Sequence, residues 1–336
     1  MSLYPLKFVP RLVEKMWGGR KIETILGKKL PPKAPIGESW EIYDFPPGIV
    51  DASTERISSI IANGPLAGRP LHWAVKEYGK DLLAEVPLVG PHGQFPLLIK
   101  FLDAREDLSV QVHPDDKYCG GHPSAHLKTE AWFIMQHDPG ARLFKGLNPG
   151  TTPQAFRAAI ETGDVEKHLG VVPAKVGQCH YLPSGTIHAL GAGILAAEVQ
   201  TPSDTTFRVY DFNRVDPSTG KKRTLHVEQA MECINFAANP EPTGPRPASR
   251  SGHRPLVESP YFKISRQRMA EGVDKPIESS QPTIWIVLQG AGQIKVDGVK
   301  DPVRFERGET ILLPMAMKNP HLKTSSDSEW LEVTFP

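Results

Sequence analysis

The sequence predicts a mostly β protein, built from small barrels or jelly rolls with a few helical elaborations. The 336 residues include 33 prolines and 29 glycines, and both residue types divide a chain into short elements. Between them lie many short runs rich in β-branched and aromatic residues. That pattern is typical of a sandwich, jelly roll or barrel. The length allows two domains or one large elaborated domain.

Before residue 236, strands are expected in six runs: Pro96–Leu102, Leu108–Val112, Ala131–Met135, Gln178–Leu182, Ile194–Gln200 and Thr206–Phe212. Helical periodicity is confined to two regions. The first comprises Ser58–Asn63 and Leu71–Tyr78. The second is a short insert at about 152–170, where Thr152 is a suitable N-cap and Pro153 occupies the first helical position.

A segment rich in proline and small polar residues, 237–255, has the composition of a linker. It divides the chain into a domain over 1–236 and a second domain over 256–336. Strands of the second domain are expected at Trp285–Leu288, Gly292–Val296, Val303–Glu306, Thr310–Leu313 and Trp330–Phe335.

An internal repeat links the two predicted domains. The frame Gly308-x5-Pro314-x-Ala316-x2-Asn319 repeats Gly177-x5-Pro183-x-Gly185-x2-His188. Because asparagine replaces histidine in the second copy, we expect the C-terminal domain to be a degenerate barrel that keeps the hairpin and binds no metal.

Charge and cysteine content exclude several classes of function. There are 39 basic and 38 acidic residues, so no net field favours nucleic acid or an acidic membrane surface. The three cysteines form no paired motif, which favours reduced thiols and a cytoplasmic protein. No apolar run has the length of a signal peptide or a membrane span. Nothing in the sequence requires more than a monomer, and a small homo-oligomer remains open.

Four side chains predict a metal site: Gln111, His113, Glu130 and His188. Gln111 and His113 are two residues apart, so a strand would direct both to the same face. The pattern around His188 indicates a strand, a tight turn and a return strand that begins at the histidine. One amide oxygen, two imidazoles and one carboxylate suit a divalent metal, with Zn²⁺ as the first candidate.

These motifs resemble known families. The frame ending at His188 resembles the second conserved motif of cupin barrels, without the asparagine that often ends it. In order, several segments resemble type I phosphomannose isomerases: Trp17-Gly18-Gly19, Gly37-Glu38-Ser39-Trp40-Glu41, Gln111-Val112-His113-Pro114, Lys128-Thr129-Glu130, His188-Ala189-Leu190 and 203–211 (SDTTFRVYD). The likeness covers about 5–236 and continues more weakly to the C-terminus. The short insert resembles the compact bacterial form.

The resemblance implies a zinc-dependent interconversion of mannose 6-phosphate and fructose 6-phosphate, by proton transfer through a cis-enediol or enediolate. Arg208 is the expected stabiliser of negative charge on oxygen. Lys128 is the favoured proton carrier, because a lysine beside a bound cation favours its neutral amine. The resemblance also places Glu198 in the pocket, either as a catalytic group or as an orienting partner. Lys100 and Ser109 are expected to contact sugar hydroxyls or the 6-phosphate.

Two other classes of function stay open at this stage. Another metal-dependent cupin enzyme, such as an oxygenase, would more often carry histidine at the position of Gln111. A non-catalytic protein that binds sugar phosphates could keep the scaffold without Lys128 or Arg208. Each residue also has a plain structural alternative. A buried histidine is often only hydrogen-bonded, Glu130 could be a surface partner of Lys128, and Arg208 could be an ion-pair partner of Asp204 or Asp211.

Overall fold

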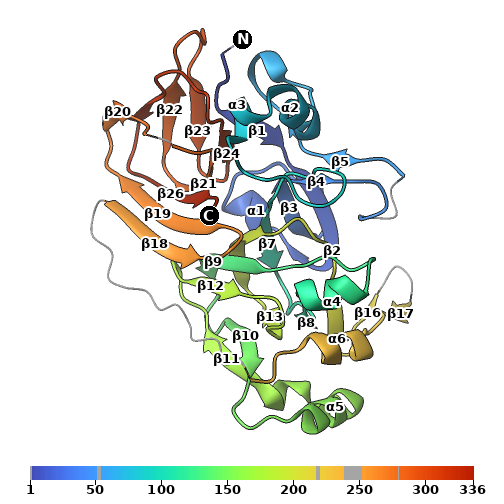
Figure 1. Cartoon of the computed structure of the whole chain (residues 1–336). Helices are drawn as coiled ribbons and strands as arrows, with labels where there is room; N and C mark the ends of the chain where they lie inside the picture. The colour runs from blue at the N-terminus through green and yellow to red at the C-terminus, as the bar shows by residue number, and fades with distance from the viewer. Residues whose placement is uncertain (1, 51–53, 217–219, 238–251, 279) are drawn as a thin grey trace.

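The computed structural model describes residues 2–336 except 51–53, 217–219, 238–251 and 279. Strands dominate it, and they form two barrels that each pack a larger sheet against a smaller one (Figure 1). The prediction of a mostly β fold with barrels is therefore confirmed.

We call the first barrel, which contains the predicted metal ligands, the N-terminal barrel. Its larger sheet has six strands in the order β12 (Cys179–Leu182), β9 (Glu130–His137), β14 (Ile194–Gln200), β7 (Leu98–Ala104), β2 (Arg11–Gly19) and β3 (Ile36–Ile42). Its smaller sheet has five, in the order β11 (Leu169–Pro173), β10 (Arg142–Leu147), β13 (His188–Leu190), β8 (Val110–Val112) and β15 (Phe207–Tyr210). Ile194–Gln200 was predicted with these bounds.

Strand alternation gives the larger sheet two different faces. Glu198 pairs with Lys100 on one neighbouring strand and with Trp132 on the other, so all three side chains point into the barrel. Phe101 and Phe133 alternate with them and belong to a hydrophobic core on the outer face. The sheet therefore presents polar groups to the barrel interior and apolar groups to the rest of the molecule.

The C-terminal barrel has the same plan. Its larger sheet runs β18 (Gly252–Glu258), β19 (Lys263–Met269), β26 (Ser328–Thr334), β21 (Thr283–Gln289), β24 (Thr310–Leu313), β1 (Leu6–Val9) and β6 (Ile60–Ile61). The smaller sheet runs β20 (Asp274–Pro276), β25 (His321–Thr324), β22 (Ala291–Lys295) and β23 (Val303–Glu306). Two strands from the start of the chain thus complete the sheet of the last domain.

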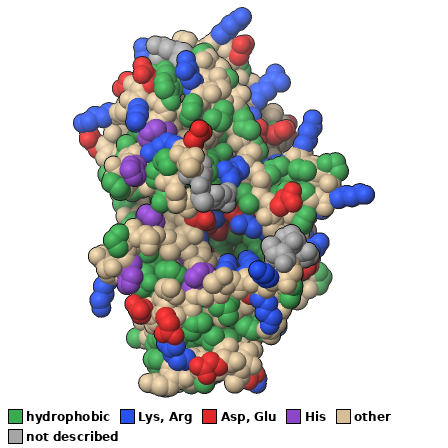
Figure 2. Space-filling model, turned by 90° about the vertical axis from the view of Figure 1, so that its right-hand side faces the viewer, with side chains coloured by type: hydrophobic (Ala, Val, Ile, Leu, Met, Phe, Trp, Pro, Cys, Tyr) green, Lys and Arg blue, Asp and Glu red, His purple; other side chains and the backbone are tan. Residues whose placement is uncertain are grey.

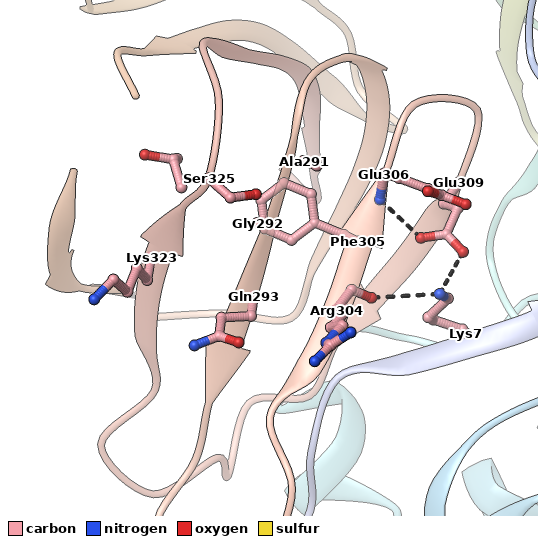
Figure 3. Close-up of a pocket in the computed structure, with 11 residues that line it drawn as sticks. Lys7, Ala291, Gly292, Gln293, Arg304, Phe305, Glu306, Glu309, Lys323 and Ser325 are labelled. Atoms are coloured by element: carbon pink, nitrogen blue, oxygen red, sulfur yellow. Dashed lines mark hydrogen bonds and ion pairs between the residues drawn. The ribbon is translucent and has the colours of Figure 1, made fainter. Parts of the chain in front are cut away.

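Strand β1 is attached to this sheet by backbone and side-chain contacts. Leu6 pairs with Leu312 across the ladder. Figure 3 shows the neighbouring Lys7, whose Nζ donates to the Arg304 carbonyl at 3.3 Å and forms an ion pair with Glu309. A surface cavity of about 570 Å³ lies beside this junction. The N-terminal segment therefore belongs structurally to both barrels.

The strand register confirms the internal repeat. Leu182 pairs with Glu130 in the first barrel, and Leu313 pairs with Thr283 in the second. Both leucines precede the proline of the repeated frame. Thr283 therefore occupies the position of Glu130, a predicted metal ligand.

A hydrophobic core joins the two barrels. It combines side chains from the outer faces of both larger sheets, including Phe101, Phe133, Ile284, Ile286 and Leu331. Separate cores fill the interior of each barrel. Because each large sheet is buried on both faces, the two barrels pack as one body.

Helices are few and short, as predicted: α1 (Lys21–Thr24), α2 (Leu71–Tyr78), α3 (Lys80–Leu83), α4 (Asp116–Gly121), α5 (Pro153–Thr162), α6 (Val227–Cys233), with 3₁₀ turns η1 (Gly64–Leu66) and η2 (Val165–His168). The expected insert is present as α5 and η2, and Thr152 caps it by accepting from Ala155 N. Within the described residues, no helix combines the length and apolar character needed to cross a membrane.

Two expectations need correction. The predicted helix over Ser58–Asn63 is wrong, because these residues lie in β6 and in β5 (Ile57–Ser58), which pairs with β4 (Asp44–Phe45). A further small hairpin joins β16 (Val215–Asp216) and β17 (Lys221–Lys222). Most of the predicted linker, 238–251, lies outside the described residues. Its last four residues, 252–255, belong to β18 and not to a linker. The division of the chain at 237–255 otherwise stays a prediction.

Candidate active site

Three predicted metal ligands converge inside the N-terminal barrel. His113, Glu130 and His188 are fully buried, and they offer donor atoms that all lie within 4.8 Å of one another. Glu130 Oε2 lies 3.3 Å from His113 Nε2, and Glu130 Oε1 lies 3.1 Å from His188 Nε2. The alternative that Glu130 is a surface partner of Lys128 is therefore wrong.

The second nitrogen of each histidine fixes which atom faces this cluster. His113 Nδ1 lies 3.1 Å from the Thr205 carbonyl, and His188 Nδ1 lies 2.8 Å from the Thr186 carbonyl. A carbonyl only accepts hydrogen bonds, so each neutral ring carries its proton on Nδ1. Each Nε2 then presents a lone pair to Glu130, which is the orientation of a metal-ligating imidazole.

Electrostatics make this cluster unfavourable without a cation. Burial, with help from the Lys128 charge, lowers the pKa of His113 to about 3, so its ring is neutral. Burial alone would raise the pKa of Glu130, but the Lys128 charge holds it well below its ordinary value. His113 Nε2 and both Glu130 oxygens have no hydrogen-bond partner among the described residues. Lone pairs that face a buried carboxylate repel it, and a divalent cation between them would remove that penalty.

Gln111 is the fourth predicted metal ligand. It pairs with His188 on one neighbouring strand and with Arg208 on the other, so the three side chains share one face of the smaller sheet. Its amide group lies 3.4 Å from His188 Nε2. A half-turn of the amide exchanges its oxygen and nitrogen, so the oxygen can face the cluster.

Lys128 lies beside the cluster. It precedes the first residue of β9, Glu130, and is not part of that strand. Its Nζ is 3.2 Å from Glu130 Oε2. The Ser184 hydroxyl donates to the Lys128 carbonyl at 2.8 Å, which fixes the backbone at this point. The lysine side chain is buried and directed at the Glu130 carboxylate.

Lys100 is held between two carboxylates. Its Nζ lies 3.2 Å from Glu198 Oε1 and 3.6 Å from Glu38 Oε2. Burial would lower the pKa of Lys100, but these carboxylates raise it, so the lysine stays charged. Burial would raise the pKa of Glu38, and Lys100 with Lys15 instead lowers it to about 2.

The two oxygens of Glu198 have different neighbours, and Oε1 has no hydrogen bond among the described residues. Oε1 faces Lys100, and Oε2 accepts from the Trp132 indole at 3.1 Å. Burial raises the pKa of Glu198 despite the nearby Lys100 charge. Trp132 also packs edge-on against the His188 ring, with centroids 5.2 Å apart. Trp132 therefore links Glu198 to the ring of His188, a predicted metal ligand.

Arg208 lies at the partly open edge of the same interior. Its Nη1 donates to the Thr224 carbonyl at 3.1 Å, and its Nε has no acceptor among the described residues. Burial and the charge of Arg223 lower its pKa to about 10. Asp211 pairs with Arg214 and Arg223 instead. The alternative that Arg208 is an ion-pair partner of Asp211 is therefore wrong.

Ser109 is buried, and its hydroxyl lies 3.5 Å from Gln111 Oε1. Sequence reasoning missed two other buried polar groups, Glu38 and His180. Alternation in Gly37-Glu38-Ser39-Trp40-Glu41 was the available signal for Glu38, because Glu38 and Trp40 share one face of β3. The surface in Figure 2 is hollowed near its centre, where acidic and basic side chains meet.

The fold and this cluster define a cupin barrel protein with a candidate site for a divalent metal. Comparisons with known proteins refine the class. A family model for the catalytic domain of type I phosphomannose isomerase matches residues 6–139. The mannose-6-phosphate isomerase of Streptococcus mutans is 34% identical over 320 residues, which cover 94% of each chain. That of Bacillus subtilis is 33% identical, over 94% of this chain and 95% of the relative.

Structure comparison agrees. A crystal structure of mannose 6-phosphate isomerase from Bacillus subtilis superimposes with a TM-score of 0.84 and 30% identity, covering 99% of this chain and 100% of the other. The chain therefore belongs to the type I phosphomannose isomerases, which are aldose–ketose isomerases.

Proposed function

We propose that this protein interconverts mannose 6-phosphate and fructose 6-phosphate with a divalent metal held by Gln111, His113, Glu130 and His188. Family membership supports the substrate. The observation that carries the metal is the buried His113–Glu130–His188 cluster, in which both imidazole protons are directed away from the shared centre. Two nitrogen and two oxygen donors suit Zn²⁺ first. When bound, such a metal supplies Lewis acidity that stabilises negative charge on sugar oxygens.

The protein's own residues must move a proton between C1 and C2 of the sugar. Lys128 is our candidate for the proton carrier, because its Nζ is buried within 3.2 Å of Glu130 and has no second carboxylate partner in the described part of the chain. Glu198 is less suited to this step, since its Oε2 accepts from Trp132 and its Oε1 faces the Lys100 ammonium. We assign Glu198 to positioning Lys100 and the Trp132 ring beneath His188.

Arg208 is our candidate for stabilising the enediolate. Its Nε has no acceptor among the described residues, and its strand position opposite Gln111 directs it toward the same interior. A guanidinium aimed at developing negative charge lowers the barrier most where water is excluded.

Lys100 and Ser109 are proposed substrate contacts. Because two carboxylates already neutralise Lys100, we assign it to sugar hydroxyls rather than to the dianionic phosphate. Ser109 adjoins Gln111 and would contact the sugar from the smaller sheet. The three cysteines are free thiols, and we propose a cytoplasmic enzyme whose partner is a small sugar phosphate.

The first test is turnover of mannose 6-phosphate by the purified protein as isolated, after chelation, and after addition of Zn²⁺. Activity that is lost on chelation and restored by Zn²⁺ supports the proposal. A protein that keeps its metal and shows no turnover would favour a sugar-phosphate sensor. Oxygen consumption would favour a different cupin chemistry.

The ligand assignment has its own test. Glu130→Ala and His188→Ala should each lose bound metal and activity together, because each removes one buried donor. His137→Ala, at the partly exposed far end of β9, is the matched control and should keep both. Full metal occupancy in Glu130→Ala and His188→Ala, measured by elemental analysis, contradicts the assignment.

A further inference from the structure

The C-terminal barrel has a cavity at its own mouth. It has a volume of about 410 Å³ and lies between β19, β21 and β26 on one side and β20 with the following residues on the other. Trp285, Trp330 and Gln267 are buried side chains that line it, together with Glu332, Lys275 and Glu278. Cavities of roughly 300–1,000 Å³ are the size that holds small molecules.

This cavity corresponds to the active site through the internal repeat. Glu332 pairs with Trp285 across the strands, as Glu198 pairs with Trp132 in the N-terminal barrel. In both barrels the indole N–H donates to the carboxylate, at 3.3 Å in the second and 3.1 Å in the first. The second barrel thus keeps the polar pair that forms the floor of the catalytic pocket.

The second barrel does not keep the predicted metal ligands. Thr283 stands at the position of Glu130, and the Asn319 amide donates to Asp297 at 2.8 Å, on the exposed side. Among the described residues, the closely spaced potential metal donors are His113, Glu130 and His188, all in the first barrel. The second cavity therefore needs a ligand that binds without a metal.

The carboxylate in this cavity is also less occupied than its counterpart. Ser265 lies opposite Glu332 where Lys100 lies opposite Glu198. The donors to Glu332 are the Trp285 indole and the Gln267 amide, both at 3.3 Å, which is longer than the usual bond of about 2.9 Å. The Trp330 indole N–H has no acceptor among the described residues. The lining therefore offers a carboxylate acceptor with only weak partners.

The charge of the lining selects the class of ligand. Glu332 and Glu278 carry two negative charges, and Lys275 carries one positive charge. A phosphate dianion is disfavoured beside this excess of negative charge. Hydroxyl groups are favoured, because a carboxylate accepts two of them at once, while the indoles and Leu322 supply an apolar surface for C–H groups.

We propose that the mouth of the C-terminal barrel binds a neutral polyhydroxylated molecule of monosaccharide size, a free sugar or polyol rather than a sugar phosphate. Glu332 accepts its hydroxyls, and Gln267 is placed to contact the same groups. The site is independent of the metal centre and of isomerisation.

The test uses D-mannitol, which has no carbonyl group and cannot be isomerised. Its binding to the full chain is measured by isothermal titration calorimetry, for the wild type, Glu332→Ala, Glu332→Gln and Glu130→Ala. We expect binding to weaken at least about tenfold in both Glu332 variants and to persist in Glu130→Ala. Unchanged isomerase activity and melting temperature in Glu332→Gln show that the fold is intact.

Three results overturn the proposal: no binding of mannitol to the wild type, equal binding by wild type and Glu332→Gln, or loss of binding in Glu130→Ala. Tighter binding of mannose 6-phosphate than mannitol at the Glu332 site overturns the neutral ligand class. Because binding is measured without turnover, failure here leaves the proposed isomerase function untouched, and failure of that function leaves this site untouched.

Discussion

Arg208 provides the sharpest residue-level prediction, because its Nε is buried and finds no acceptor in the described part of the chain. Arg208→Ala should retain metal and fold but lose about 10²–10³ in turnover, the usual effect of removing one donor aimed at developing negative charge. The measurement is kcat with mannose 6-phosphate, alongside metal content. Arg142→Ala is the control, since Arg142 is an exposed arginine paired with Glu166. A rate near that of the wild type would exclude the proposed role.

His180 gives a prediction about pH. Burial, reinforced by the Lys145 charge, lowers its pKa to about 4, below the value of about 6.5 in an unfolded chain. The unfolded state therefore takes up a proton first as the pH falls, and stability decreases from about pH 6.5 toward pH 4. His180→Leu should flatten this decrease by up to about 3 kcal/mol.

The check is urea unfolding of wild type and His180→Leu at pH 7 and pH 4.5. His253→Leu is the control, because His253 is exposed and its loss should leave the pH dependence as in the wild type. The same decrease in all three proteins would show that other groups, such as His113, account for the effect.

At this scale, spacing in the sequence was enough to bring His113, Glu130 and His188 together, because alternation and the hairpin frame fix which face each occupies. For Glu38 alternation indicated a face shared with Trp40, but spacing did not show that this face, or the one that carries His180, is the interior. Each faces the interior only because its strand pairs with a distant one: β3 pairs with β7, and β12 pairs with β9. Long-range pairing decides such positions, and local pattern does not contain it.

At the scale of elements, the approach of β2 to β3 imposes a glycine. A Cβ on Gly18 would lie 2.5 Å from Gly37 N and from the Pro35 carbonyl. Gly18→Ala should therefore destabilise the protein by about 1–3 kcal/mol, the range for overpacking. Gly120→Ala, in α4 with no atom within 4 Å of the added Cβ, should be neutral or slightly stabilising. Chemical denaturation measures both, and equal stability of the two variants would contradict the close contact.

Element prediction succeeded where pattern and partner agree. Ile194–Gln200, Val303–Glu306 and Thr310–Leu313 were predicted with the bounds that the structure has, since each is a short run of strand-type pattern. Ser58–Asn63 failed because its two isoleucines, Ile60 and Ile61, are adjacent and define no helical period. Pairing of β6 with β1 decides its conformation instead.

At the scale of the whole molecule, the two barrels share structure. Strands β1 and β6 from the first domain complete the sheet of the second, and one hydrophobic core contains the outer faces of both larger sheets. Sequence analysis divided the chain by composition and could not predict this exchange, because the partner of β1 lies about 300 residues away, at Leu312. Such sharing implies that neither barrel loses its structure alone.

Leu6 tests this coupling. It is fully buried in β1 and pairs with Leu312, so Leu6→Ala should destabilise the protein by about 2–5 kcal/mol. Loss of tryptophan fluorescence and loss of isomerase activity should shift together in urea, although the active site lies in the other barrel. Val9→Ala is the matched control, because Val9 lies in the same strand but is 50% exposed. Separate transitions for fluorescence and activity would show that the barrels unfold independently, because the shared strand would then not couple them.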